Sequence, residues 1–297
     1  MKVLVTGGSG QVGFELRRQL ATLGEILAPD RATLDLSSAD AVDAFLAHHQ
    51  PDLVVNAAAY TAVDNAESDQ QTATRLNADL PAQLASYCQQ RSCWLVHYSS
   101  DYVYSGEGSM PWQESDATAP CNAYGATKLA GDEAVAKSGC QHLIFRTSWV
   151  YSAHGKSFLS TMLRLGAERD TLSIVGDQIG SPTPARLIAL VTQQALLLTQ
   201  EPGRSVSSGV YHLAPKGEVS WHGFACEIFQ QAGLAGLPIM ISPEGVSSIP
   251  TTDYPTPALR PLNSRLSVGK LEAALGIVLP SWQSQLALTV EEIANAR

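Results

Sequence analysis

Several features that would point to a membrane, a nucleic acid or an oxidising compartment are absent from this sequence. No uninterrupted apolar stretch is long enough to cross a bilayer, and no basic, apolar leader opens the chain. The five cysteines are odd in number and form no Cys-x-x-Cys pair, so we interpret them as reduced thiols. The net charge of −9 argues against a nucleic-acid partner. We therefore expect a soluble cytoplasmic protein.

The regular alternation of predicted strands and helices defines the fold class. Short apolar strands are predicted at 2–6, 26–28, 53–55, 94–98 and 143–145, with helical periodicity in between. This pattern predicts an α/β fold built on a doubly wound, Rossmann-like parallel sheet. We assign residues 1–150 to this sheet, with a returning segment near 172–198. Residues 151–171 and about 199–297 would form a second, smaller α/β domain for the substrate.

A glycine loop follows the first strand immediately, as Gly7-Gly8-Ser9-Gly10-Gln11-Val12-Gly13. Gly7 would permit the tight turn, Gly10 the close approach of a pyrophosphate, and Gly13 the close packing of a helix on the sheet. Asp30 ends the second strand about 20 residues later, where an acidic residue can bind a ribose hydroxyl. A glycine-rich turn without a ligand is the alternative. The order of strand, loop, helix and acid favours a dinucleotide site.

Three alanines mark the end of the third strand. Ala57, Ala58 and Ala59 stand where a strand should meet its loop, and such small side chains let a flat cofactor pass close to the backbone. Tight packing of a helix on the sheet is the other explanation.

Tyr124 and Lys128 are candidates for acid–base chemistry. In a helix, for which Asn122 is a candidate N-cap, they lie four residues apart and share a face. An ammonium one turn away stabilises a phenolate and would lower the pKa of the tyrosine towards neutrality. Tyr-x-x-x-Lys also occurs by chance in many helices, so the pair needs support from its surroundings.

Ser100 follows the fourth strand, at the edge where open parallel sheets bind their ligands. Its hydroxyl could donate a hydrogen bond to a substrate carbonyl, although an isolated serine more often caps a helix or a turn. His97 in the same strand has no histidine or cysteine partner at metal-ligand spacing, and we interpret it as a core or edge histidine.

Together these features resemble the extended short-chain dehydrogenase/reductase superfamily, and within it the family of dTDP-4-dehydrorhamnose reductases. The resemblance covers nearly the whole chain. It is carried by the segments 60–67, 97–104, 124–131, 146–151, 177–183 and 260–266. It implies reduction of the 4-keto group of dTDP-4-dehydro-6-deoxy-L-mannose to dTDP-L-rhamnose, with NADPH or NADH as cofactor and a nucleotide sugar as substrate.

The resemblance also implies roles for single residues. Tyr124 would donate the proton, Lys128 would support it and bind the nicotinamide ribose, and Ser100 stands where many relatives have threonine. Asp101 and Trp149 would bind the sugar together with Ser100. Cofactor contacts are expected from Gly7, Gly10, Gln11, Val12, Gly13, Asp30, Asp35, Leu36, Ala57, Ala58, Ala59, Tyr60, Thr61, Tyr98, Tyr124 and Lys128.

Some members of this family form metal-linked dimers through glutamates. Glu15 could serve, but Arg186 lies on a helix where a carboxylate would be needed, so we predict no metal site and leave a homodimer open. Two alternatives to the reductase are a non-catalytic regulatory subunit of the same fold and a reductase of a related nucleotide 4-keto-6-deoxysugar. The joint presence of Ser100, Tyr124 and Lys128 favours an enzyme.

Overall fold

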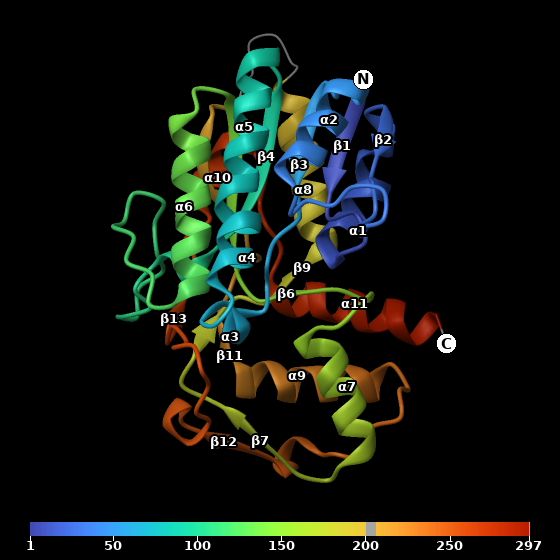
Figure 1. The fold of residues 1–297 in the computed structure, drawn as a ribbon. Coiled ribbons are helices and arrows are strands. Elements are labelled where there is room, and N and C mark those ends of the chain that lie inside the picture. Colours follow the sequence, from blue (N-terminus) through green and yellow to red (C-terminus); the bar gives the residue numbers. More distant parts are fainter. Residues whose placement is uncertain (200–205, 297) are drawn as a thin grey trace.

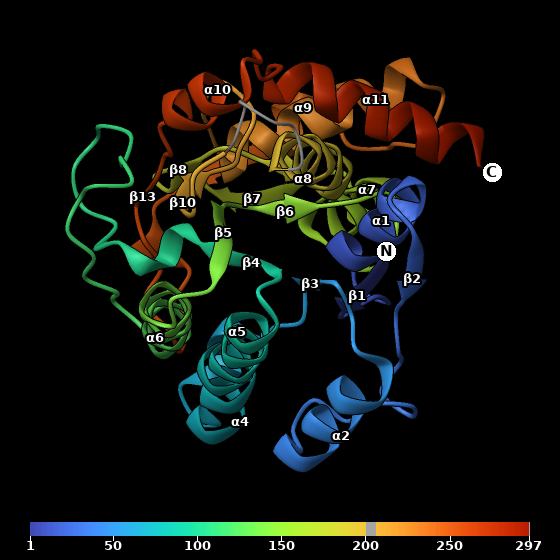
Figure 2. The ribbon, with the colours of Figure 1, turned by 90° about the horizontal axis from the view of Figure 1, so that it is seen from above.

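Six parallel strands form the central sheet, in the order β10-β5-β4-β3-β1-β2 (Figures 1 and 2). The computed structural model describes residues 1–199 and 206–296. The strands are β1 (Lys2–Thr6), β2 (Glu25–Leu27), β3 (Leu53–Asn56), β4 (Trp94–Ser100), β5 (Gln141–Thr147) and β10 (Gly209–His212). The direction in which strands are added reverses between β1 and β3, as in doubly wound sheets. The predicted fold class is therefore confirmed.

Helices cover both faces of this sheet (Figure 2). One face carries α2 (Ala39–His49), α5 (Leu80–Arg91) and α6 (Ala123–Lys137). The other carries α1 (Gln11–Gln19), α8 (Ala185–Thr199) and α10 (Gly269–Leu275). A separate hydrophobic cluster fills each interface. Burial on two faces explains why the central strands are almost continuously apolar rather than alternating.

A second, smaller region has its own hydrophobic cluster and lies beyond the carboxyl ends of the central strands (Figure 1). It contains α7 (Phe158–Glu168), α9 (Trp221–Leu234) and α11 (Trp282–Asn295), together with a pair of parallel strands, β7 (Leu172–Val175) and β12 (Val246–Ile249). Short strands join the two regions: β6 (Val150–Tyr151), β8 (Ile179–Gly180), β9 (Thr183–Pro184), β11 (Val219–Ser220) and β13 (Asn263–Ser264).

The remaining elements are short helical turns in the connections. They are η1 (Leu20–Thr22), α3 (Val63–Ala66), α4 (Gln70–Thr74), η2 (Arg75–Asp79), η3 (Asp101–Val103), η4 (Pro243–Gly245) and η5 (Thr251–Asp253). Of these, η2 is a π-helical turn between α4 and α5.

The structure differs from the predicted returning segment near 172–198 at both ends. The part of that segment that returns to the central sheet is α8, and β10 follows it, because β10 pairs in parallel with β5. The predicted segment 172–198 includes β7, which instead pairs with β12 in the smaller region. Periodicity alone identifies such strands but not their partners, which depend on contacts between residues far apart in the sequence.

Helix α6 approaches its neighbours closely at two glycines. A Cβ on Gly125 would overlap the backbone carbonyl of Tyr102, and a Cβ on Gly131 would overlap that of Asn77. Larger side chains would push the helix away from η3 and η2. These glycines therefore determine how near the side chains of α6 come to the end of β4.

No helix in the described ranges 1–199 and 206–296 is both long enough and apolar enough to span a membrane.

We predict that Gly131→Ala destabilises the protein by roughly 1–3 kcal/mol, the usual cost of overpacking. Gly233→Ala is the matched control, because Gly233 also lies in a helix but has open space where a Cβ would stand. That control should be neutral or slightly stabilising, since alanine favours helix more than glycine does. Urea unfolding of both variants measures the difference. Equal stability of the two would contradict the proposed close contact.

Candidate active site

The start of helix α6 positions Tyr124 beside the end of β4. The Asn122 side chain accepts a hydrogen bond from the Gly125 amide at 2.8 Å, so the predicted N-cap is confirmed. Tyr124 lies in the first turn, and its ring meets that of Tyr102 edge to face at a centroid distance of 5.5 Å. The cap fixes where the helix begins and therefore which way Tyr124 points.

Lys128 is buried one turn further along the same helix, with only 1% of its surface exposed. Its ammonium donates a hydrogen bond to the carbonyl oxygen of Tyr98 at 2.6 Å and lies 3.5 Å from Nε2 of His97. Burial lowers the pKa of Lys128 to about 8, and the nearby Asp132 carboxyl opposes this shift. The lysine is thus held against the end of β4 in a poorly solvated position.

The pKa of Tyr124 differs from the prediction. The pair with Lys128 predicts a lowered pKa, but the loss of surrounding water raises the pKa of Tyr124 to about 12. The Ser100 hydroxyl acts in the opposite direction and only partly offsets this effect. Desolvation is the largest cause, and the buried carboxyls of Asp101 and Asp132 add to it, while the Lys128 ammonium is bound by the Tyr98 carbonyl. Tyr124 is therefore a neutral phenol at neutral pH, which is the form able to donate a proton.

Ser100 and Asp101 lie together at the carboxyl end of β4. The Ser100 hydroxyl accepts a hydrogen bond from the Tyr102 amide at 3.2 Å and donates one to Oδ1 of Asp101 at 3.0 Å. Within the described residues, Oδ2 of Asp101 is buried and has no hydrogen-bond partner. Burial raises the pKa of Asp101 to about 7, although the hydroxyls of Ser264 and Ser100 counteract it. A buried carboxyl with a free oxygen next to the candidate proton donor is suited to binding a polar ligand.

The glycine loop has the geometry of an anion site at a helix start. Gly7 has a φ of +67°, and its carbonyl accepts a hydrogen bond from the Gly10 amide at 2.9 Å. A Cβ on Gly13 would overlap the Gly7 carbonyl, so the helix packs directly on the loop rather than on the sheet. Gly10 is the N-cap of α1 and has no side chain to occupy the first-turn amides. Those amides can therefore bind a pyrophosphate.

The predicted cofactor residues around this loop have structural partners as well. The Gln11 side chain donates to the carbonyl of Lys156 at 3.2 Å, and Val12 packs on the core. Ala57 donates its amide to the carbonyl of Thr6 at 3.2 Å, and a Cβ on Gly7 would stand 2.7 Å from the Ala58 nitrogen. The three-alanine loop thus lies directly against the glycine loop, as a shared binding surface requires.

The acidic candidates at the other side of the loop are both exposed. Oδ1 of Asp30 accepts hydrogen bonds from the amide and the hydroxyl of Thr33 at 2.9 and 2.8 Å, and these bonds lower its pKa. Asp35 makes the same arrangement with Ser37, which also lowers its pKa, and Leu36 between them is half-buried. Both carboxylates are therefore ionised and held in fixed positions at neutral pH.

Asn77 is a residue of this site that the sequence did not reveal. Its side chain accepts a hydrogen bond from the Tyr60 amide at 2.8 Å and donates to the Tyr60 carbonyl at 3.1 Å. It also donates to the Thr127 hydroxyl at 3.1 Å. Asn77 therefore holds the Ala59-Tyr60-Thr61 loop against α6. Its only sequence signal was an asparagine in a helical pattern, which carries no functional information.

Tyr98 takes a different place from the one predicted. Its side chain belongs to the core, and its hydroxyl lies 2.7 Å from that of Thr192 in α8. Its visible contribution to the site is the backbone carbonyl that binds Lys128. Because side chains alternate between the two faces of a strand, Tyr98 and His97 point in opposite directions.

Trp149 is held in an unusual conformation by the smaller region. Its φ of +48° is rare for a bulky residue. The ring stacks on Trp221 at 3.6 Å, and Gly180 leaves room for it, since a Cβ there would stand 2.7 Å from the indole. Trp221, which the sequence also did not reveal, donates a hydrogen bond from Nε1 to the Gln178 side chain at 3.1 Å. The indole of Trp149 is therefore a rigid surface.

Glu15, the glutamate considered for a metal, lies beside an arginine that also pairs with Glu292. One guanidinium nitrogen of Arg186 lies 2.7 Å from Glu292 and 3.6 Å from the buried Glu15. In the described part of the chain, no three His, Cys, Asp or Glu side chains are arranged to hold a metal ion. His97 is fully buried, as predicted for a core histidine.

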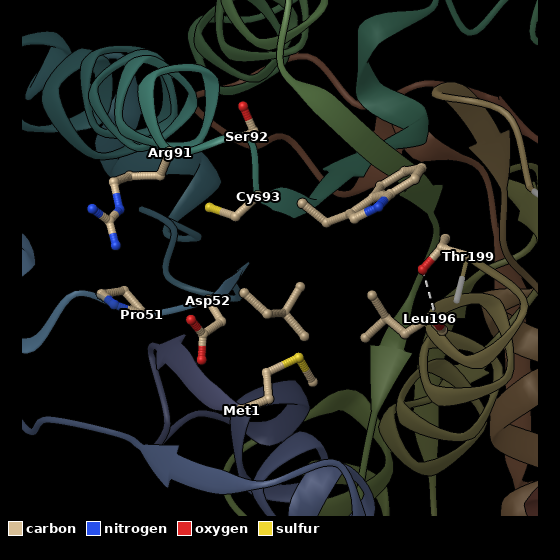
Figure 3. A pocket seen from close by; sticks show the side chains of 10 residues that line it. Met1, Pro51, Asp52, Arg91, Ser92, Cys93, Leu196 and Thr199 are labelled. Carbon is tan, nitrogen blue, oxygen red and sulfur yellow. Dashed lines mark hydrogen bonds between the residues drawn. The ribbon is translucent and has the colours of Figure 1, made fainter. Parts of the chain in front are cut away.

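A pocket of about 320 Å³ lies away from these residues, at the amino ends of the central strands (Figure 3). It is lined by Asp52, Arg91 and Cys93, among others. The candidate catalytic residues are at the opposite, carboxyl edge of the sheet, where open parallel sheets bind their ligands.

Comparison with known proteins gives consistent matches over the full length. A family model described as RmlD substrate binding domain matches residues 1–295. The dTDP-4-dehydrorhamnose reductase of Escherichia coli is 43% identical over 297 residues, covering 99% of this chain and 98% of that protein. That of Burkholderia thailandensis is 46% identical over 299 residues, with 99% and 100% covered. The crystal structure of dTDP-4-dehydrorhamnose reductase from Bacillus anthracis in complex with NADP is 31% identical, with a TM-score of 0.89 and 98% and 99% covered.

We predict that Asp101→Asn stabilises the protein more at pH 8 than at pH 5. Burial raises the pKa of Asp101 from 3.8 to about 7, so its stabilising contribution is complete below pH 3.8 and is lost as the pH rises through 7. Asparagine does not ionise and avoids that loss. The gain of the variant over wild type should therefore grow by about 3 kcal/mol between the two pH values. Urea unfolding measures it, with the exposed Asp170→Asn as control; a pH-independent difference would contradict the argument.

Proposed function

The chain belongs to the RmlD substrate binding domain family, and from this membership we propose that it reduces the 4-keto group of dTDP-4-dehydro-6-deoxy-L-mannose to dTDP-L-rhamnose with NADPH or NADH. The observation that supports this proposal most directly is the position of Tyr124, Lys128 and Ser100. All three lie at the carboxyl edge of the sheet that also carries the glycine loop.

The cofactor, when bound, supplies a hydride to the keto carbon. We propose that the amides at the start of α1, next to Gly10, bind its pyrophosphate, and that the Ala57–Ala59 loop lies against it. Asp30 would accept hydrogen bonds from a ribose, because it is exposed and Thr33 fixes its Oδ1.

The proton is the part of the reaction that this chain supplies. An alkoxide is a much stronger base than a phenolate, so a Tyr124 phenol with a pKa of about 12 can still protonate the developing oxyanion. Ser100 would turn its one hydroxyl proton from Oδ1 of Asp101 to the same oxygen and so donate a second hydrogen bond, in the manner of an oxyanion hole. Lys128 binds the nicotinamide ribose and provides the positive charge that offsets the phenolate once the proton has left.

We propose that the smaller region binds the nucleotide sugar. Asp101 and Trp149 follow the carboxyl ends of β4 and β5, and the neighbours that position them are Ser100 and Trp221 respectively. A cytoplasmic location and a homodimer stay predictions. All five cysteines are free thiols, which supports the prediction of a cytoplasmic location.

Tyr124→Phe should bind NADPH normally and lower turnover roughly 10²–10⁴-fold, the usual contribution of a positioned acid. The assay follows NADPH absorbance with enzymatically prepared dTDP-4-dehydro-6-deoxy-L-mannose, and cofactor binding is measured separately by fluorescence. Tyr87→Phe is a matched control, because its hydroxyl donates to the Pro51 carbonyl at 3.0 Å, beside the pocket at the opposite edge of the sheet. Near-normal turnover in a folded Tyr124→Phe variant would contradict the assignment.

The same assay separates the alternatives. A regulatory subunit would consume no NADPH, and a reductase of a related sugar would prefer another 4-keto-6-deoxy substrate. Incubation with dTDP-glucose and NAD⁺ should produce no 4-keto-6-deoxy product. Dehydratases of this superfamily follow their hydroxyl residue with Asp-Glu, whereas Tyr102 stands here after Asp101, and burial raises the pKa of Tyr102 above its ordinary value.

Arg31→Ala should weaken NADPH binding more than NADH binding, although the wild type uses both cofactors. Arg31 is exposed beside Asp30 and close enough to lower the pKa of Asp35, so it can reach a ribose 2′-phosphate. Dissociation constants for both cofactors test this, with Arg91→Ala on the opposite edge of the sheet as control. Equal losses for both cofactors would show that Arg31 does not bind the phosphate.

A further inference from the structure

A row of buried polar groups runs beneath the candidate active site, and its central member, Asp132, has no role in the chemistry described above. Asp132 lies on α6 one turn beyond Lys128, so Tyr124, Lys128 and Asp132 form a single column on one face of the helix. Only 2% of Asp132 is exposed. A carboxyl that is so deeply buried requires compensating charge.

One compensating charge comes from Arg146 in β5. Its Nε donates to Oδ2 of Asp132 at 2.9 Å, and one of its terminal nitrogens donates to the Tyr104 hydroxyl at 2.8 Å. A guanidinium does not lose its proton in proteins. Oδ1 of Asp132 has no hydrogen-bond partner within the described residues. The half of the carboxylate that faces away from Arg146 is therefore available to another cation.

His97 lies between that oxygen and the lysine. Its Nε2 is 3.5 Å from Nζ of Lys128 and 3.8 Å from Oδ1 of Asp132. Its Nδ1 faces the Asn56 amide nitrogen at 3.1 Å, and Asn56 uses its oxygen to accept the Thr6 hydroxyl at 2.6 Å. Nδ1 therefore accepts, and Nε2 carries the proton. Burial, with a smaller effect of Lys128, lowers the pKa of His97 far below its ordinary value, so the ring adds no charge.

We propose that Asp132 is a positioning residue that acts through Lys128. Its carboxylate balances the lysine charge across the edge of His97 and so keeps the ammonium protonated against the Tyr98 carbonyl. Without Asp132, the buried charges of Lys128 and Arg146 would face each other without compensation. Because arginine keeps its proton, the lysine would lose its own. This inference rests on the proposed reductase function.

The other groups near the lysine do not replace this carboxylate. Tyr124 is a neutral phenol at neutral pH because its pKa is about 12. Asp101 lies in η3, and the hydrogen bond that its side chain makes within the described residues is with Ser100, not with Lys128. Burial lowers the pKa of Lys128 to about 8, and Asp132 is the charge that raises it. The geometry and the balance of charges thus point to the same residue.

The test is the pH dependence of kcat at saturating substrate and NADPH, measured for two variants with opposite expected shifts. In Asp132→Asn the lysine loses its counter-charge, so the fall in activity at alkaline pH should begin about one pH unit lower than in wild type. In Arg146→Met the competing cation is removed, so the fall in kcat at alkaline pH (the alkaline limb) should begin at a higher pH than in wild type. Asp132→Glu retains the charge and should restore the wild-type limb.

Glu133→Gln is the matched control, because Glu133 is an exposed neighbour whose ion pair, within the described ranges, is with Lys137. This variant should leave the profile unchanged. The dissociation constant for NADPH at pH 6 should stay within about twofold of wild type in every variant, which separates a charge effect from loss of the fold. If Asp132→Asn does not fold, the expected shift of the alkaline limb to higher pH in Arg146→Met still tests the inference.

An unchanged limb in Asp132→Asn, or shifts of the same sign in Asp132→Asn and Arg146→Met, would overturn the inference. A wild-type protein that does not reduce the keto sugar would instead overturn the proposed function.

Discussion

The hydrogen bond from the Lys128 ammonium to the Tyr98 carbonyl, 2.6 Å long, is the contact on which the site depends. A buried ammonium is costly unless it is paired, so this bond fixes the distance between helix α6 and the end of β4. The helix can come so near only because Gly125 and Gly131 leave its backbone uncovered. Tyr124 and Ser100, one on each element, are brought together as a consequence.

Burial shifts the pKa values of the three central groups so that each group is favoured in its uncharged form. It raises the pKa of Tyr124 to about 12 and of Asp101 to about 7, and it lowers that of Lys128 to about 8. Each shift favours the uncharged form. The site is therefore suited to reduction, which requires a protonated donor. The one positive charge that it needs is that of Lys128, which stays protonated because the Asp132 carboxylate balances it. Burial favours the neutral form of Lys128, whereas catalysis requires the charged form.

Much of the fold and part of the site follow from local sequence. The strand β1, the glycine loop and the cap at Asn122 each depend on a few neighbouring residues and are where the sequence predicts them. The pairing of β10 with β5, by contrast, depends on contacts between distant segments. The raised pKa of Tyr124 could not be predicted either. The sequence shows that a lysine is near, but it does not show how completely burial removes water from around the phenol. Asn77 and Trp221 became visible only through their partners.

The strained backbone at Trp149 shows how the two regions act on one site. A positive φ of +48° on a tryptophan persists only where the surroundings enforce it. Here the stack on Trp221 and the space above Gly180 enforce it, and both belong to segments that follow β6. Trp149 itself lies two residues after β5, whose Arg146 pairs with Asp132 on α6. β5 and the two residues that follow it thus carry, three residues apart, an arginine next to the proton donor and an indole positioned by the smaller region. Any movement of the smaller region would therefore displace Trp149, at the edge of the sheet where the substrate is expected to bind.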